Sequence, residues 1–220
     1  MIWRYYIKIL RYEQFLVPAA LMAICLLMMV LLPTAAPSIA LGFMEAALPL
    51  ATAIIATGLF LNDPFLELQY TMSRPMWRTL LERMASLIAV MLPFYILFSL
   101  LTRLLGVSLI GWGATASVFL VWIIPTIAWL GIIFFIGTLI RNNIAGNGLG
   151  ALLWMGCFML HAALMGSPLG RAVYPFMTIM EPTSTDWSLN RVVLLSIGMI
   201  GVGISLLMLR KSELYFRAEA

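Results

Sequence analysis

Charged residues are scarce in this sequence. Of its 220 residues only 10% are Asp, Glu, Lys or Arg, whereas 63% are hydrophobic, and the mean hydropathy is +1.04. A soluble domain of average composition is about 25% charged. The scarcity of charge excludes an ordinary water-soluble domain. It predicts an all-α, polytopic membrane protein in which residues 1–220 form a single transmembrane domain.

Histidine and cysteine are almost absent as well. His161 is the single histidine, and the two cysteines, Cys25 and Cys157, each lie in an apolar run without a C-x-x-C pattern. Haem or metal binding inside a membrane needs several ligands at helical spacing, and His161 has none beside it. We therefore expect no metal ion and no cofactor. His161 is either a hydrogen bonder between helices or a functional residue.

Nucleotide-binding and nucleophile motifs are missing. There is no G-x-x-x-x-G-K-[ST] loop, no G-x-G-x-x-G after a predicted strand and no G-x-S-x-G. The chain is therefore not expected to bind ATP or to be an enzyme, and ATP-driven work would require a partner. Its formal net charge of +4 comes from basic residues dispersed near the ends of apolar segments. This distribution favours anionic membrane lipid over nucleic acid as the partner.

Long apolar runs are what the sequence has instead. Six of them are long enough to cross about 30 Å of hydrocarbon. The fourth is unusually long and carries Pro125 near its middle, so a tilt or a kink is expected there. The predicted span cores are 15–33, 43–61, 84–102, 114–140, 148–166 and 192–209.

Basic residues set the predicted orientation. With the N-terminus in the cytoplasm, ten basic residues fall on the cytoplasmic side and three fall on the other, namely Arg103, Arg171 and Arg191. This bias predicts that both termini and residues 62–83 are cytoplasmic in a multi-pass protein of the plasma membrane. The sequence contains no N-x-[ST] site, which is consistent with a bacterial source.

Residues 62–83 form the one stretch where charges of both signs gather between two long apolar runs. Asp63 followed by Pro64 is typical of a helix start, and Pro75 disfavours helix at Arg74 before it. A first short helix therefore ends there, and a second begins at once and continues into the membrane. The apolar stripe of the first helix is Phe65, Leu68 and Met72, and the charged face of the second is Arg74, Arg78 and Glu82. Spacing alone leaves open whether the segment is a docking surface or an ordinary interfacial loop.

Two other segments outside the spans have patterns of their own. Residues 1–14 place basic and apolar side chains on different helical stripes, which predicts a helix lying in the headgroup region, with a frayed basic tail as the alternative. Residues 167–191 contain three prolines with aromatics among them, so this outer segment is expected to dip back into the membrane under cover of protein. In the last span three glycines permit close helix approach: Gly198, Gly201 and Gly203.

Glu45 is exceptional among the acids because it lies inside a predicted span, just before Pro49. An acid at such a depth is costly and points to a functional site that faces a wet cavity or a partner. The alternative is a terminal residue that snorkels to the interface. Arg103, at the outer end of the third span, is the ion-pair partner that the sequence suggests. Glu45 and Arg103 are thus candidates for a translocation path.

Two stretches of the sequence resemble the permease subunits of ABC type-2 transporters. One runs from Glu45 through Pro49 and Asp63 to Glu67, and it is similar to that family's acid-and-proline second span leading to an acidic cytoplasmic helix. The other is SRPMWRTLLER at 73–83, which is similar to the family's junction into the third span. The Gly-Thr pair common before that junction is absent here, which leaves the subfamily and the cargo open.

The resemblance implies an architecture and a set of partners. Members are half-transporters with six spans, cytoplasmic termini, an N-terminal interfacial helix, a cytoplasmic coupling helix and a re-entrant outer segment. For this chain the resemblance implies a coupling helix gripped by a separate ABC ATPase (nucleotide-binding) subunit, and a second permease subunit, identical or homologous. The residues implied to receive the ATPase motion are Asp63, Phe65, Glu67, Leu68, Met72, Arg74 and Arg78.

The expected function is therefore that of a permease subunit in an ATP-driven exporter. Its cargo is expected to be amphipathic or lipid-like, since the spans offer few charges to hold a hydrophilic solute. Two other classes stay open. One is a membrane enzyme that uses Glu45, His161 or Asp186 in an outer cavity, and the other is a structural subunit whose contact face is formed by the glycines of the last span.

Overall fold

The computed structural model describes residues 13–61, 76–107, 115–140, 142–181 and 183–218. Within these ranges every regular element is helical and no strand occurs, as the all-α prediction requires. So apolar a chain favours helices because each helix satisfies its own backbone hydrogen bonds. The elements are α2 (Glu13–Leu31), the 3₁₀ turn η1 (Pro33–Ala35), α3 (Ala36–Leu41), the π-helix η2 (Gly42–Ala47), α4 (Leu48–Leu61), α6 (Met76–Leu104), α7 (Thr115–Ile140), α8 (Asn143–Met159), α9 (His161–Met165), α10 (Pro168–Val173), α11 (Met177–Met180) and α12 (Trp187–Ala218).

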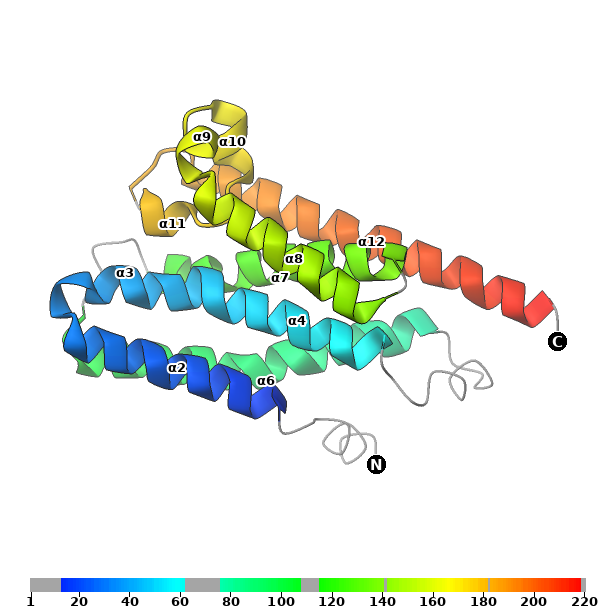
Figure 1. The fold of residues 1–220 in the computed structure, drawn as a ribbon, viewed down its shortest axis with the longest axis horizontal. Helices are drawn as coiled ribbons and strands as arrows, with labels where there is room; N and C mark the ends of the chain where they lie inside the picture. The colour runs from blue at the N-terminus through cyan, green and yellow to red at the C-terminus, as the bar shows by residue number, and fades with distance from the viewer. Residues whose placement is uncertain (1–12, 62–75, 108–114, 141, 182, 219–220) are drawn as a thin grey trace.

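The long helices lie side by side in an elongated bundle that carries a cap at one end (Figure 1). We define the cap as residues 160–181, which include the short helices α9, α10 and α11. The start of α2, the end of α4, the start of α6 and the end of α12 all lie at the opposite end of the bundle (Figure 1). Helix α7 is central, since it packs against α4, α8, α12 and η2.

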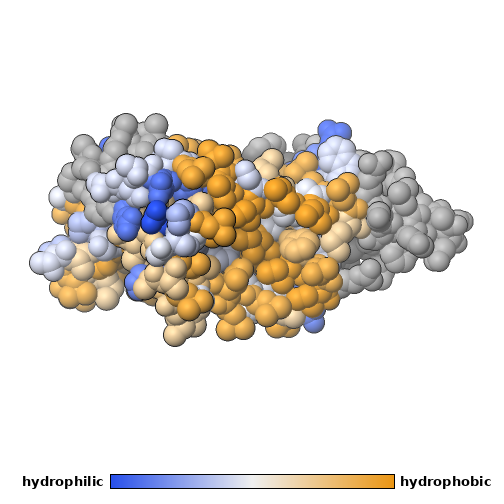
Figure 2. Space-filling view, turned by 90° about the horizontal axis from the view of Figure 1, so that it is seen from above, coloured by the Kyte–Doolittle hydropathy of each residue, from blue (hydrophilic) through white to orange (hydrophobic). Residues whose placement is uncertain are grey.

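Four stretches of the described chain are helical, long and apolar enough to cross a membrane. Two further apolar helical stretches, Phe15–Leu31 and Ile144–Met159, are shorter. Figure 2 shows hydrophobic side chains covering the middle of the molecule and hydrophilic ones gathered nearer the cap, as expected for a protein whose middle lies in lipid. The four candidate spans are Pro33–Ala56, Trp77–Leu104, Val118–Ile140 and Trp187–Leu209.

The interior of the bundle is built mainly from the first and third of these four candidate spans. The spans Pro33–Ala56 and Val118–Ile140 are mostly buried, whereas the other two are mostly exposed on the outside of the bundle. Three buried threonines in these spans are satisfied within their own helices. The hydroxyl groups of Thr52, Thr126 and Thr138 each donate to the carbonyl oxygen four residues earlier in the same helix, at 2.7 to 2.8 Å.

Glycines let α7 and α12 approach until their backbones touch. A Cβ atom on Gly198 would lie 2.5 Å from the carbonyl oxygen of Ile127, and one on Gly201 would lie 2.6 Å from that of Gly131. Gly203, in contrast, has no atom within 4 Å of its missing Cβ. The close approach expected at the last-span glycines is therefore confirmed for Gly198 and Gly201, which contact another helix of the same chain.

Two predicted boundaries are wrong. The fifth apolar run does not continue as one helix to residue 166, because α8 ends at Met159 and Leu160 leaves the helical conformation with φ −92° and ψ 16°. His161 thus lies at the start of α9 in the cap and is exposed, and not inside a span. The second apolar helix begins earlier than residue 43, at Ala36. The residues just before the end of α8 are mostly apolar, so composition does not reveal where that helix ends.

Replacement of Gly198 by leucine is expected to destabilise the bundle strongly. The side chain would meet the backbone of α7, which cannot move aside as a flexible side chain would, so we expect a loss of about 1–3 kcal/mol or more. The measurement is the midpoint of thermal unfolding in detergent, followed by size-exclusion chromatography. Gly203→Leu is the matched control, because it makes the same change in the same helix with open space around it. Equal midpoints for the two variants would contradict the backbone contact.

Candidate functional site

Glu45 is completely buried, and it lies in the π-helix η2. Pro49 has no N–H to donate to the Glu45 carbonyl four residues earlier, so α-helical bonding cannot be kept at this point. The turn before it is wider, as shown by the backbone N–H of Leu48, which donates to the carbonyl of Phe43, five residues back. Single π-turns inside helices occur frequently at functional sites. Here the π-turn lies beside the cap, which α11 brings into contact with η2.

Four donor groups from the cap and α12 converge on the Glu45 carboxylate. Its Oε1 accepts hydrogen bonds from the Thr178 N–H at 3.1 Å, from the Thr178 hydroxyl at 2.8 Å and from Nη2 of Arg191. Its Oε2 accepts from the Ile179 N–H at 2.9 Å. A buried carboxylate needs an opposite charge and several donors to replace its lost hydration. This group of contacts, which we call the Glu45 cluster, supplies both.

Arg191 is the charge partner in this cluster, and its side chain is 3% exposed. Its guanidinium lies over the Trp187 ring, 5.1 Å from the ring centroid, and its Nη2 also donates to the Thr178 hydroxyl oxygen. The Trp187 indole N–H donates to the same oxygen at 3.0 Å. Thr178 is therefore the junction at which the carboxylate, the guanidinium and the indole meet.

Two further contacts attach the cap to the start of α12. The Arg171 Nε donates to Oδ2 of Asp186 at 2.8 Å, in an ion pair that is about one-third exposed. The buried amide of Asn190 donates to three cap carbonyl oxygens, those of Arg171, Ala172 and Tyr174, at 2.8 to 3.1 Å. The last carbonyl groups of a helix such as α10 need donors from outside that helix. Asn190 supplies them from the first turn of α12.

The centre of the cap is aromatic. Phe176 is fully buried, and four rings surround it with centroid separations of 5.1 to 6.4 Å. These rings are Trp129, Trp154, Phe158 and Tyr174. They come from α7, from α8 and from the cap itself, so the cap is packed onto the bundle by apolar contacts as well as by the Glu45 cluster.

The expected pairing of Glu45 with Arg103 is wrong. The carboxylate binds Arg191, while Arg103 is exposed in the last turn of α6. The sequence placed both arginines at the outer side, and only the arrangement of helices decides which one reaches Glu45. A snorkelling Glu45 is also excluded, because its side chain has no exposed surface.

Most residues of the implied coupling segment lie outside the described residues. They are Asp63, Phe65, Glu67, Leu68, Met72 and Arg74, and their role stays a prediction. Arg78 is described: it is exposed in the first turn of α6, and its Nε lies 3.3 Å from Oε1 of Glu82. The expected interfacial helix over 1–14 likewise falls outside the described residues, except for its last two positions, which begin α2.

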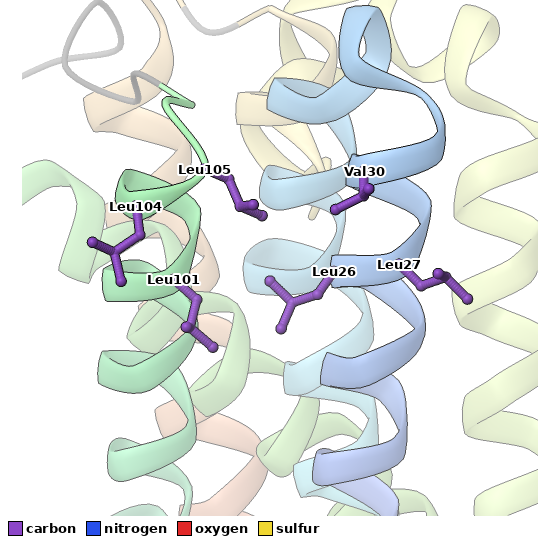
Figure 3. Close-up of a pocket in the computed structure, with 6 residues that line it drawn as sticks. All are labelled: Leu26, Leu27, Val30, Leu101, Leu104 and Leu105. Atoms are coloured by element: carbon purple, nitrogen blue, oxygen red, sulfur yellow. The ribbon is translucent and has the colours of Figure 1, made fainter.

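The residues proposed for an enzyme do not assemble in the described part of the chain. Glu45 is enclosed by its donors, Asp186 is paired with Arg171, and His161 is exposed on α9. No group of three or more His, Cys, Asp or Glu side chains that could hold a metal ion occurs there. The described chain also has an apolar groove of about 330 Å³. Figure 3 shows leucines of α2 and α6 facing each other across it; the lining residues are Leu26, Leu27, Val30, Leu101, Leu104 and Leu105.

Thr178, Trp187, Asn190 and Arg191 were not predicted as site residues. A signal for two of them was present, because Asn190 and Arg191 are polar residues at the beginning of an otherwise apolar run. The other two had no such signal. Thr178 becomes a site residue only because the fold brings its hydroxyl and amide to Glu45, 133 positions away in the sequence.

Removal of the Glu45 carboxylate is expected to destabilise the protein by about 3–5 kcal/mol, because Glu45→Ala leaves a buried, uncompensated arginine. The double variant Glu45→Ala/Arg191→Leu removes that charge as well and should lose less than the sum of the two single changes. The measurement is the free energy of unfolding in a denaturing-detergent titration. Arg103→Ala, which alters an exposed arginine, is expected to change it little and serves as the control.

Tyr174 is expected to affect stability only at high pH. Burial, with smaller contributions from the nearby Glu45 and Cys157, raises the pKa of Tyr174 to about 12. The unfolded chain loses this proton near pH 10, so the folded protein holds one proton more between about pH 10 and 12, and stability falls as the pH rises through that window. Tyr174→Phe lacks the effect. Thermal midpoints of both proteins should agree at pH 7 and diverge in favour of the variant above pH 10, whereas a constant difference would contradict the shift.

No family model, curated protein or solved structure matches the chain. Its function therefore has to be inferred from the bundle, from the cap and from the Glu45 cluster that joins them.

Proposed function

We propose that this protein is the membrane-spanning permease subunit of an ATP-driven exporter of the ABC type-2 kind. In this proposal the chain crosses the plasma membrane six times with both termini in the cytoplasm. The shorter apolar helices α2 and α8 then serve as the first and fifth spans, beside the four longer candidates. Two permease subunits form the translocation path, and two separate ATPase subunits drive it.

The observation that carries the proposal is that α4 ends and α6 begins at the end of the bundle opposite the cap, where α12 also ends (Figure 1). Residues 62–75 join these two helices in the sequence, and with the first residues of α6 they make up the charged segment 62–83. Rigid helices leave both sides of this connection, so a push on it would be transmitted along α4 and α6. A soluble ATPase that grips the segment would therefore act on the bundle from the end where α2 begins and α12 ends.

The Glu45 cluster is a second observation that supports the exporter proposal. A motor at one end of a bundle can move cargo only if the other end closes and opens. The cap provides a closure there, held by a buried carboxylate that the fold alone does not require, since such a charge is costly in a membrane. An apolar interior with few charges favours an amphipathic or lipid-like cargo over a hydrophilic solute.

A structural subunit of a larger membrane complex is the second candidate. The glycines that suggested a contact face for it, Gly198 and Gly201, are used within the chain against α7. A membrane enzyme is the third, and the described residues bring no acid, base and nucleophile together in support of it. Transport into reconstituted vesicles separates the exporter from both.

Charge reversal or an inserted proline in the coupling segment is expected to uncouple ATP hydrolysis from transport. Asp63→Lys, Glu67→Lys and Leu68→Pro alter the surface that an ATPase would grip, and they should leave membrane insertion intact. The experiment first searches the adjacent reading frames for a Walker-type ATPase. The chain is then purified with that ATPase and reconstituted in vesicles, and ATP hydrolysis and cargo movement are followed together. We expect transport to fall at least tenfold while hydrolysis continues, since a loss of about 1.4 kcal/mol in coupling free energy already gives that factor.

Glu181→Lys is the matched control for these variants, because it reverses an exposed acid in the cap at the other end of the bundle. It should copurify with the ATPase as the wild type does. Full transport by all three coupling variants, or the absence of any ATPase companion from the intact assembly, would refute the proposed function.

A further inference from the structure

The polar contacts of the cap divide into two groups according to what they connect. The Arg171–Asp186 pair and the three bonds of Asn190 join the cap to the start of α12, and they link residues 15 to 19 positions apart. The bonds of Glu45 join the cap to η2, which lies 133 or more positions away in the sequence. The first group holds neighbouring segments together, and the second crosses between two separate parts of the bundle.

We propose that the Glu45 carboxylate is a latch. The cap stays attached to α12 and separates from η2 at the Glu45 cluster when the cap end of the bundle opens. This inference rests on the exporter function proposed above. It identifies the cap as the element that closes the bundle and the contact between the cap and η2 as the place where the cap separates.

The arrangement of donors and acceptor in the Glu45 cluster suits a separation of the cap from η2. All the donors, from Thr178, Ile179 and Arg191, are on the cap and α12, and the single acceptor is the Glu45 carboxylate. One side chain therefore has to move for the polar contact to break. On the cap side Thr178, Trp187 and Arg191 stay bonded or stacked to one another without it. The cap keeps its own organisation after release.

Arg191 also makes the open state less costly. Only its Nη2 is bonded, and its buried Nε and Nη1 have no hydrogen-bond partner among the described residues. Buried donors without partners lower the stability of the closed arrangement. Water that entered with the opening would hydrate these groups, which offsets part of the lost ion pair. A contact that is strong yet incompletely satisfied is suited to a two-state element.

Amide hydrogen exchange on the full chain in lipid nanodiscs tests the latch directly. The N–H groups of Thr178 and Ile179 both donate to Glu45, so they report its state. In Glu45→Gln we expect exchange at these two amides to become roughly tenfold faster, while α10 and the first turns of α12 keep their wild-type rates. Thr178→Val, which removes only the hydroxyl, should give a smaller increase at the same place and replaces Glu45→Gln if that variant folds poorly.

Asp186→Asn is the matched control, since it weakens the other group of contacts by removing a single charge. Its effect should fall on α10 and leave Thr178 and Ile179 protected. Two outcomes would overturn the latch. In the first, Glu45→Gln speeds exchange across the whole cap, which would mean that Glu45 only stabilises the fold. In the second, Glu45→Gln leaves exchange at Thr178 and Ile179 unchanged.

The exchange readout needs no ATPase, so it is independent of the exporter proposal. Addition of the ATPase and ATP to the wild type should speed exchange at Thr178 and Ile179 and spare α10. Latch behaviour without an ATPase companion would refute the exporter and leave the latch standing. ATP-driven transport with these two amides unchanged would refute the latch and leave the exporter standing.

Discussion

A buried carboxylate cannot be left without partners in the apolar interior of a helix bundle, and the cap is organised around that constraint. Glu45 has no exposed surface, and it draws a threonine hydroxyl, two backbone amides and an arginine towards one point. Removal of any member would leave buried charge or buried donors unsatisfied. The cluster therefore fixes where α11 and the start of α12 lie relative to η2.

The long helices of the bundle are held together by close packing. Between helices in lipid there is little hydrophobic gain, so close packing of surfaces has to supply the attraction. The contact of Gly198 and Gly201 with α7 does this by bringing two backbones together. This packing has no charges that could switch. The cap end has charges, those of Glu45 and Arg191, so an opening of the bundle is more readily located there than at the glycine contact.

Much of the fold could be predicted from the sequence because it depends on composition. Long apolar runs have to be helices in a membrane, and the helices of the structure lie where those runs are. That Glu45 needs polar or charged partners was predictable for a similar reason, since a charge at that depth is costly wherever it lies. Its pairing with Arg103 was not, because arginines on the same side of the membrane differ only in which helix carries them. The end of α8 at Met159 was missed since no proline or glycine marks it.

The sequence by itself determined that this is a helical protein with stretches long and apolar enough to span a membrane and an acid inside the second of its apolar runs, because hydrophobicity and charge are local properties of the residues. The tertiary structure alone decided that Arg191 pairs with Glu45, that Thr178 and Trp187 join them, and that His161 belongs to the cap. These are contacts between residues up to 146 positions apart. They depend on how helices pack, which no local pattern encodes.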